Sequence, residues 1–293
     1  MQVYSSCGKW ILLGEHAVLR GCPALVFPTK QYPLTLSVQS NHYEHSILIE
    51  PNLDPSLSSV TLELYYESQR LLGLPEMNGI EQAISLSGKL PPGQGLGFSA
   101  ALCVLVAQWA CDQVSNPSLS VLELAHRLEH RFHGQSSGID IVGVASQMPQ
   151  YFESIQMHHD LEMSWRPQWY LSEPKGRTCT IDCVQKVSDW RHASPLDGQQ
   201  VDDMMREAVD QAMKALQGHA SQDTFDQLAQ AMRLGQRCFE RWGLVPREVE
   251  SSIQSLYDAG AAAVKLTGAG GACCQISLWQ TAPPVSLALT PLC

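Results

Sequence analysis

The feature that most constrains the fold is a stretch in which three glycines stand at every second position directly before a long apolar run. In PPGQGLGFSAALCVLVAQWA, residues 91–110, these glycines are Gly93, Gly95 and Gly97. Glycine is entropically costly and is used where the backbone must turn left-handed or approach another group closely. The apolar run predicts a helix that is buried on all sides. Free N–H groups and the positive dipole end at the start of such a helix suit a phosphate group.

The same stretch also fits a tight turn that only packs against a buried helix, because glycine-rich turns are common. It lacks the lysine of a Walker A loop, and it does not match the Rossmann glycine pattern. Taken alone, residues 91–110 leave a phosphate cradle and a structural turn as open alternatives.

Composition indicates a folded protein with a large core. The chain has 293 residues, is 44% hydrophobic and carries a net charge of −10, and no Lys/Arg cluster offers a basic face to nucleic acid. No apolar run is long enough to span a bilayer, and the N-terminus lacks the order of a signal peptide. The ten cysteines are scattered, so we expect free, buried thiols. We therefore expect a cytoplasmic protein without a nucleic-acid or membrane partner.

Turn signals and periodicity divide the chain into a β-rich beginning and a helical second half. Residues 1–50 alternate turns with β-rich pieces. The clearest helix follows Ser120, which forms a capping box with Glu123, and it ends at Gly134. Further helices are predicted over 201–218, 224–243 and 246–260.

Residues 163–183 lie between the two halves, are rich in Pro, Trp and Gly, and indicate strand. We therefore expect an α/β protein of two domains, 1–173 and 174–293, with the boundary near Glu173.

The segment HGQSSGID, residues 133–140, directly follows the clearest helix and ends in a single carboxylate. We expect Asp140 on a loop. There it could accept the proton of a substrate hydroxyl, or hold that hydroxyl in line with a transferring phosphoryl group. An Asp after Ser-Gly is also a common turn residue or helix cap, so both interpretations stay open.

Two further stretches contain residues suited to phosphate chemistry. In GKWILLGEHAVLRG, residues 8–21, Lys9 lies between a turn and a strand. It could neutralise phosphate charge or keep a carboxylate ionised, although an exposed strand-edge lysine is the ordinary alternative. In KLTGAGGACC, residues 265–274, three glycines exceed what a hairpin needs. They suggest close approach to a ligand or to backbone, and a bulged hairpin stays open.

A competing signal is the sequence H-x-x-E-H formed by His126, Glu129 and His130, a zinc-binding signature of some metalloproteases. Two histidines four residues apart face the same side of a helix, and the glutamate could activate a zinc-bound water. The motif is short, however, and histidines near a helix end also satisfy the helix dipole. Zinc would leave the glycine loops unexplained, so we keep a zinc hydrolase as the lesser alternative.

In their order and spacing, the four stretches together resemble the motifs of the GHMP kinase family. Residues 8–21 resemble its first motif, 91–101 its second, 133–140 the segment with the catalytic aspartate and 265–274 its third. The resemblance implies a two-domain GHMP kinase architecture: an N-terminal mixed α/β ATP-binding domain and a C-terminal helix-rich, ferredoxin-like α+β domain. It also implies that ATP and Mg²⁺ bind between them.

Carried over to this chain, the resemblance assigns a role to each matching residue. Asp140 would be the base or positioning carboxylate, and Lys9 its charged neighbour. Glu129 and Ser99 would bind magnesium. The residues implied to contact ATP are Pro92, Gly93, Gly95, Leu96, Gly97, Ser99 and Ala100. Those implied to contact or support the substrate are Glu15, His16, Gly268, Ala269, Gly270 and Gly271.

The E-H-A-V form of the first motif, residues 15–18, is typical of family members that phosphorylate mevalonate. The implied reaction is therefore ATP-dependent phosphorylation of the primary hydroxyl of mevalonate to 5-phosphomevalonate, a step of isoprenoid synthesis. Phosphomevalonate, another hydroxy acid or a sugar stays open as acceptor, as does a nucleotide-binding regulator without catalysis. Phe98, Ala272 and Cys273 depart from the family pattern, and the sequence leaves open whether the chain forms a homodimer.

Overall fold

The computed structural model describes residues 1–293 except 41–46, 75–81, 135, 174–175, 177–178 and 293. The chain divides into two compact units, and neither unit is one continuous segment. Unit 1 comprises residues 1–9, 28–92 and 96–147. Unit 2 comprises residues 10–27, 93–95 and 148–293. The predicted boundary near Glu173 stays a prediction.

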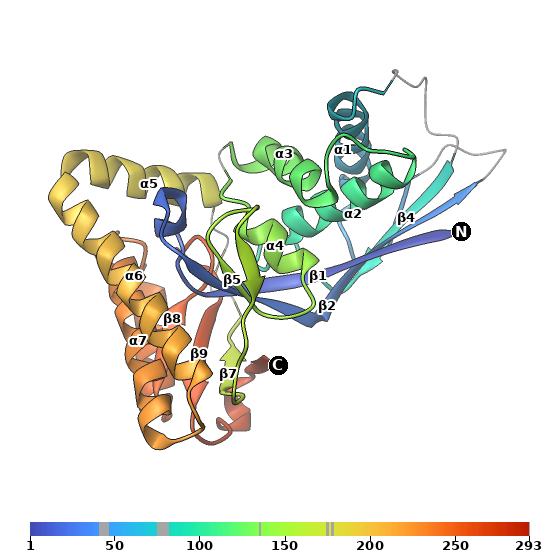
Figure 1. The fold of residues 1–293 in the computed structure, drawn as a ribbon. Coiled ribbons are helices and arrows are strands. Elements are labelled where there is room, and N and C mark those ends of the chain that lie inside the picture. The colour runs from blue at the N-terminus through green and yellow to red at the C-terminus, as the bar shows by residue number, and fades with distance from the viewer. Residues whose placement is uncertain (41–46, 75–81, 135, 174–175, 177–178, 293) are drawn as a thin grey trace. The chain divides into compact units, whose positions relative to one another are not determined.

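Two long strands, β1 (Gln2–Leu13) and β2 (Ala24–Ser40), have residues in both units. The other elements of unit 1 are β3 (Ile47–Ile49), α1 (Leu57–Leu71), β4 (Gln82–Gly88), α2 (Phe98–Asp112), α3 (Val121–His133) and α4 (Ile139–Ala145), labelled in Figure 1 where space allows.

The sheet of unit 1 follows from alternating side chains. In β2, Leu34, Leu36 and Val38 are buried, and the polar residues between them are not as deeply buried, which is the pattern of a strand with one face on a core. This part of β2 pairs antiparallel with β4, and β3 pairs parallel with β4. The register places Leu36 opposite Leu86, so the buried faces of the two strands coincide.

Helix α2 is the centre of unit 1 and confirms the prediction of a helix buried on all sides. Within it, all residues except Ser99, Gln108 and Asp112 are buried. It packs against α1, α3 and α4. Trp109 stacks on Tyr65 of α1, with ring centroids 3.7 Å apart.

Helix α3 also confirms its prediction in detail. The hydroxyl of Ser120 accepts a hydrogen bond from the Glu123 N–H, the Glu123 carboxylate accepts one from the Ser120 N–H, and Gly134 is the C-cap. Leu124 and Leu128 are buried on the face toward the core. The helix therefore holds Glu129 on a fixed, well-capped scaffold.

Unit 2 holds the predicted helices of the second half of the chain. Its elements are the 3₁₀ helix η1 (Ala17–Arg20), β5 (Gln150–Phe152), β6 (His158–Asp160), β7 (Gln168–Leu171), α5 (Thr180–Ala193), α6 (Pro195–Gln217), α7 (Gln222–Arg241), α8 (Arg247–Asp258), β8 (Ala263–Leu266), β9 (Gln275–Trp279), the 3₁₀ helix η2 (Val285–Leu287) and β10 (Thr290–Leu292).

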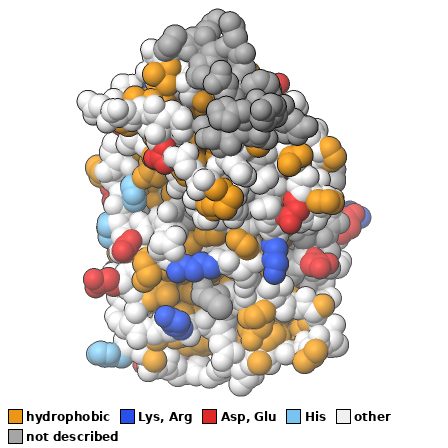
Figure 2. Space-filling view, turned by 90° about the vertical axis from the view of Figure 1, so that its right-hand side faces the viewer, with side chains coloured by type: hydrophobic (Ala, Val, Ile, Leu, Met, Phe, Trp, Pro, Cys, Tyr) orange, Lys and Arg blue, Asp and Glu red, His pale blue; other side chains and the backbone are white. Residues whose placement is uncertain are grey.

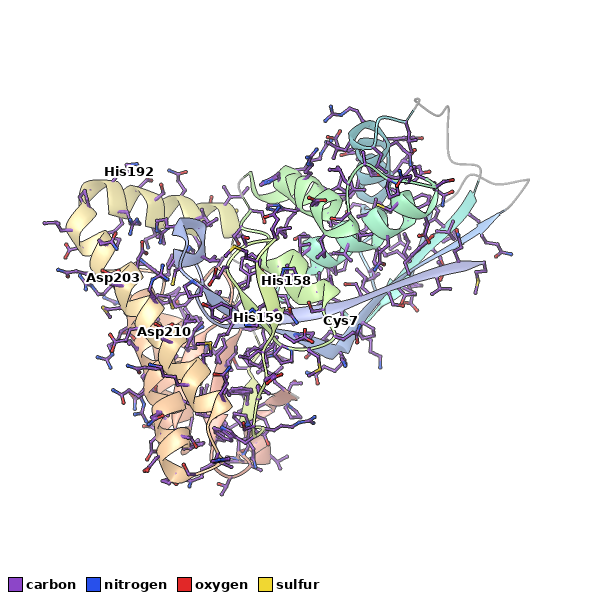
Figure 3. The ribbon with its side chains drawn as sticks, in the orientation of Figure 1. Cys7, His158, His159, His192, Asp203 and Asp210 are labelled. Atoms are coloured by element: carbon purple, nitrogen blue, oxygen red, sulfur yellow. The ribbon has the colours of Figure 1, made fainter. Side chains whose placement is uncertain are left out.

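The described residues of unit 2 form an antiparallel sheet with strand order β10-β7-β9-β8. Helices α6 and α7 run side by side, and α7 packs against β8 (Figure 1). Both helices are amphipathic. Met205 and Val209 of α6 are buried, whereas Asp203 is exposed and projects from the other side of the helix (Figure 3).

One prediction for this unit is partly wrong. Residues 163–183 were expected to have strand character, but among the described residues of this range only Gln168–Leu171 form a strand, and Thr180 already begins α5. Cys183 and Val187 are buried one helical turn apart, so burial of this helix face favours a helix here over the strand that the sequence indicated.

None of the helices in the described part of the chain is both long and apolar enough to cross a membrane. On the face shown in Figure 2, Lys and Arg side chains stand apart from one another among hydrophobic and acidic side chains. The described residues of that face therefore form no continuous basic surface of the kind with which proteins bind nucleic acid.

Candidate functional site

In unit 1, a buried lysine contacts the predicted catalytic carboxylate. Lys9 lies in the buried part of β1, and its Nζ is 2.9 Å from Oδ1 of Asp140. Asp140 was expected on a loop, but it lies in the first turn of α4, whose N-cap is Gly138 with φ +84°. A carboxylate in the first turn is favoured by the helix dipole. Lys9 is 2% exposed and Asp140 28%, so solutes can reach the pair from the side of Asp140.

Gly97 brings the lysine to the start of α2. It is the N-cap of this helix and has φ +83°, a left-handed conformation that favours glycine. A Cβ on Gly97 would lie 2.9 Å from Cγ of Lys9 and 3.0 Å from Cγ1 of Val144. The Lys9 N–H also donates to the Leu96 carbonyl at 2.9 Å. Close approach of a lysine, and not only the turn, therefore requires glycine here.

The two preceding glycines of the motif belong to unit 2. Gly93 and Gly95 have φ +76° and +78°. A Cβ on Gly93 would meet no atom within 4 Å among the described residues, whereas one on Gly95 would lie 3.6 Å from Sγ of Cys273. Gly93 thus borders open space, where a ligand could approach its backbone.

Glu129 is the second carboxylate of the cluster in unit 1. It is 1% exposed. Burial and the charge of Asp140 raise the pKa of Glu129 to about 8, although the hydrogen bond from Ser136 and the charge of Lys9 lower it. Its Oε1 is buried and has no hydrogen-bond partner among the described residues. A buried carboxylate with a free oxygen beside a second carboxylate fits a magnesium ion, which proteins hold with one or two carboxylates while substrate phosphates supply further ligands.

The histidines of the H-x-x-E-H signature have a different role from zinc binding. Nε2 of His126 donates to the Ser136 carbonyl at 2.9 Å, and the Ser136 N–H donates to Nδ1 of His130 at 3.2 Å. Within the described ranges, no group of three or more His, Cys, Asp or Glu side chains is arranged to hold a metal ion. The geometry therefore does not support a zinc hydrolase.

In unit 2, the two polar residues of the first motif are both buried. Oε1 of Glu15 is 2.6 Å from Nζ of Lys265, on strand β8. His16 adopts φ +57°, which is uncommon for a residue other than glycine and points to a functional constraint. The edge contacts of its ring with Phe239 and Trp242 help to hold this conformation.

The protonation state of His16 follows from its contacts. Its Nε2 is 2.9 Å from the Ala269 carbonyl, and since a carbonyl only accepts, Nε2 carries the hydrogen. Burial lowers the pKa of His16 to about 4, so the ring is neutral near pH 7. Its Nδ1 is therefore a hydrogen-bond acceptor.

The third glycine loop joins β8 to β9, and its glycines all have positive φ. Gly268 has φ +80°, Gly270 +93° and Gly271 +67°. A Cβ on Gly270 would lie 3.0 Å from Cβ of Leu244, and one on Gly268 would lie 3.5 Å from the Gly95 carbonyl. The positive φ angles favour glycine throughout this loop, and at Gly270 the close approach of the Leu244 side chain favours it as well.

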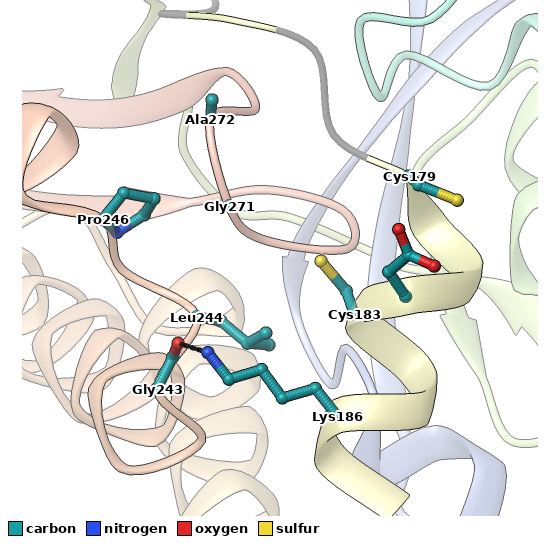
Figure 4. Close-up of a pocket in the computed structure, with 9 residues that line it drawn as sticks. Cys179, Cys183, Lys186, Gly243, Leu244, Pro246, Gly271 and Ala272 are labelled. Carbon is teal, nitrogen blue, oxygen red and sulfur yellow. Dashed lines mark hydrogen bonds between the residues drawn. The ribbon is translucent and has the colours of Figure 1, made fainter.

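A pocket of about 360 Å³ lies beside this loop in unit 2 (Figure 4). Gly271 and Ala272 form one wall, and Cys183 and Lys186 of α5, with its N-cap Cys179, line the pocket from the other side. Nζ of Lys186 donates to the Gly243 carbonyl at 2.5 Å, so this lysine connects α5 to the loop after α7.

The predicted site residues thus form two groups. Those in unit 1 are Lys9, Pro92, Leu96, Gly97, Ser99, Ala100, Glu129 and Asp140. Those in unit 2 are Glu15, His16, Gly93, Gly95, Gly268, Ala269, Gly270 and Gly271. Ser99 lies in the first turn of α2. Ala100 is buried, and its side chain packs in the core.

Sequence reasoning missed two residues that contact this machinery. Lys265 interrupts the apolar run A-A-V-K-L, and a lysine inside a strand that is otherwise apolar could have signalled a buried partner. Ser136 has no such signal, because a serine in a Ser-Ser-Gly turn is ordinary.

Comparisons with known proteins agree with this geometry. The family model for the N-terminal domain of GHMP kinases matches residues 60–147, and the model for their C-terminal domain matches residues 205–277. The mevalonate kinase of Thermococcus onnurineus is 26% identical over 95% of this chain and 89% of its own length.

Two solved structures show the same fold. The L. major mevalonate kinase in complex with R-mevalonate has a TM-score of 0.76 at 21% identity, covering 96% of this chain and 88% of that chain. The Streptococcus pneumoniae phosphomevalonate kinase in complex with phosphomevalonate and AMPPNP has a TM-score of 0.75 at 19% identity, covering 96% and 93%. These similarities confirm the predicted two-domain architecture. Together with the two family models, they show that the chain belongs to the GHMP kinase family and is a kinase, an ATP-dependent phosphotransferase.

Proposed function

We propose that this kinase transfers the terminal phosphoryl group of ATP to the primary hydroxyl of mevalonate and forms 5-phosphomevalonate for isoprenoid biosynthesis. The observation that carries the proposal is the buried Lys9 paired with Asp140 beside the buried Glu129. The curated relatives named mevalonate kinase and the E-H-A-V sequence of residues 15–18 support mevalonate as the acceptor.

Asp140 and Lys9 would act on the reacting groups. The exposed side of Asp140 can accept a hydrogen bond from the acceptor hydroxyl, orient its oxygen toward the phosphorus, and take its proton as the bond forms. Lys9, held near Asp140 by the ion pair, supplies positive charge where negative charge develops on the transferring group. Most of the rate enhancement then comes from orientation and charge neutralisation.

The nucleotide would be bound by backbone groups and a cation. The first-turn N–H groups of α2 and the glycines Gly93, Gly95 and Gly97 are suited to the ATP phosphates. Glu129 and Ser99 would hold Mg²⁺, which neutralises phosphate charge when bound.

The acceptor would contact the group in unit 2. The Nδ1 of His16, an acceptor in the neutral ring, suits a substrate hydroxyl. Glu15 is held by Lys265, and the loop 268–271 supports His16 through the Ala269 carbonyl. These residues would therefore determine which small hydroxy compound is phosphorylated.

An acceptor panel tests the proposal. The purified protein is given labelled ATP and Mg²⁺ with mevalonate, phosphomevalonate or galactose, and labelled product is separated and counted. We expect phosphorylated mevalonate from the unaltered chain and almost none from Asp140→Asn, which should still bind ATP. Transfer only to phosphomevalonate or galactose would show that this compound, and not mevalonate, is the acceptor. Binding of ATP without transfer to any of the three would favour a nucleotide-binding regulator.

A further inference from the structure

Ser136 forms hydrogen bonds with three side chains that lie within about one turn of α3. Its carbonyl accepts from Nε2 of His126 at 2.9 Å, its N–H donates to Nδ1 of His130 at 3.2 Å, and its hydroxyl donates to Oε2 of Glu129. Residues 126, 129 and 130 lie on one helix face because they are spaced by three and four positions. We call these four residues the serine clamp.

The clamp fixes the direction of the Ser136 hydroxyl. The hydroxyl oxygen accepts a hydrogen bond from the Gly138 N–H at 3.0 Å, so the hydroxyl's single hydrogen is available for Glu129. The same hydrogen bonds determine which ring nitrogens carry hydrogen: Nε2 of His126 must carry one, and Nδ1 of His130 must not. The two rings lie with centroids 4.6 Å apart.

The consequence is that the two oxygens of Glu129 become different. Oε2 is occupied by Ser136, whereas Oε1 is buried without a hydrogen-bond partner among the residues that the structure describes. Ser136 also contacts Gly138, the N-cap of α4, two residues before Asp140. One serine therefore links the orientation of Glu129 to the helix start that carries Asp140.

We propose that Ser136 is a positioning residue that turns the carboxylate of Glu129 so that Oε1 points to the cation bound with ATP. The inference rests on the proposed role of Glu129 but not on the identity of the acceptor. It also explains the H-x-x-E-H sequence: the histidines hold the serine that orients the glutamate. Ser136 is not itself a metal ligand in this arrangement, because its oxygen is bonded to Glu129 and Gly138.

The test compares three variants of the full chain. Ser136→Ala removes only the hydroxyl and keeps the backbone contacts to both histidines. Ser136→Thr keeps a hydroxyl at the same position. Ser120→Ala is the matched control, because Ser120 is also bonded to a glutamate of α3, Glu123 at 2.8 Å, but lies at the opposite end of the helix.

The readout is binding of Mn²⁺, as a spectroscopic substitute for Mg²⁺, to the protein with ATP and without acceptor, measured by electron paramagnetic resonance. We expect Ser136→Ala to weaken Mn²⁺ binding about 10–100-fold, as is typical when a residue that orients a metal ligand is removed. Ser136→Thr should restore most of the affinity. Ser120→Ala should lower the melting temperature and leave Mn²⁺ affinity unchanged.

Equal Mn²⁺ affinity in Ser136→Ala and the unaltered protein would overturn the inference. Equal losses in Ser136→Ala and Ser120→Ala would also overturn it, because they would show a general effect of helix stability. So would failure of the unaltered protein to bind Mn²⁺ in the presence of ATP. Normal Mn²⁺ binding that depends on Ser136, together with no phosphorylation of mevalonate, would refute the proposed acceptor and leave this inference standing.

Discussion

Two lysine–carboxylate pairs among the described residues differ in their access to solvent. In unit 1, Lys9 and Asp140 are 2.9 Å apart and the carboxylate is 28% exposed. In unit 2, Lys265 and Glu15 are 2.6 Å apart and are 0% and 2% exposed. Nζ of Lys265 also donates to the Leu266 carbonyl and lies 5.1 Å from the ring centroid of Phe239.

From this difference we infer that the pair in unit 1 contacts the substrate, whereas the pair in unit 2 has a structural role. A substrate can replace solvent at Asp140, and the charges there are free to respond to a transferring phosphate. In unit 2, both partners of the pair are shielded from solvent. Each buried charge is therefore tolerated only because the opposite charge of its partner offsets the cost of burying it. Removing one partner should therefore affect a different property in each unit: turnover should fall in unit 1, and the free energy of unfolding should fall in unit 2.

The largest effect is expected from Lys265→Met. This change leaves Glu15 buried without its cation, which should lower the free energy of unfolding by about 3–5 kcal/mol. Urea denaturation followed by tryptophan fluorescence measures the loss. In Glu15→Leu/Lys265→Met, where no charge is left behind, much of the stability should return, and a double variant less stable than the single one would contradict the role of the pair.

Lys9→Met should mainly lower activity. Loss of one positive group at the transferring phosphate should reduce kcat about 10²–10³-fold, which is about 2.7–4 kcal/mol of transition-state stabilisation. The loss of unfolding free energy should be smaller than in Lys265→Met, because Asp140 can be solvated from its exposed side. Steady-state kinetics and urea denaturation on the same sample measure both, and a kcat within a factor of ~2 of the unaltered protein would refute the assignment of Lys9.

The effect expected from Glu129→Gln differs from the first two because it depends on pH. The pKa of Glu129 is raised from 4.5 to about 8 in the folded chain, so the folded state holds a proton that the unfolded state releases between these values. Its contribution to stability is complete below pH 4.5, falls as pH rises through this window, and levels off above pH 8. Glutamine does not titrate, so the variant should gain stability relative to the unaltered protein as pH rises.

Urea denaturation without nucleotide or divalent cation, at intervals from pH 5 to pH 9, measures the difference between the two proteins. A stability difference that stays constant over this range would show that burial and Asp140 do not perturb Glu129. The result would also remove the contrast between a unit 1 cluster with an extra carboxylate and the compensated pair of unit 2.

Local signals predicted the scaffold well. The capping box at Ser120, the stop at Gly134 and the burial of α2 on all sides are all present. These features depend on hydrogen bonds and side-chain periodicity within a few residues, so the sequence contains all the necessary information. The left-handed conformations of Gly93, Gly95 and Gly97 belong to the same class.

Predictions that depended on context were less accurate. The segment at Thr180 is helical because its apolar residues find a core on one side, and Asp140 lies in a helix turn because Gly138 caps α4. The H-x-x-E-H sequence is compatible with zinc or with a serine clamp, and only the position of Ser136 distinguishes them. Short motifs specify side-chain chemistry but not the partner that each side chain meets.

The sequence by itself determined the helices, the glycine turns and the resemblance to GHMP kinases, since each is encoded in neighbouring residues or in a short motif. The resemblance also implied that Lys9 lies beside Asp140. Only the tertiary structure decided that Lys265 pairs with Glu15 some 250 positions away, and that one oxygen of Glu129 is bonded to Ser136 while the other has no hydrogen-bond partner among the described residues. The physical reason is that these contacts depend on how separate elements pack, and packing sets the burial and the charge environment that give a carboxylate its role.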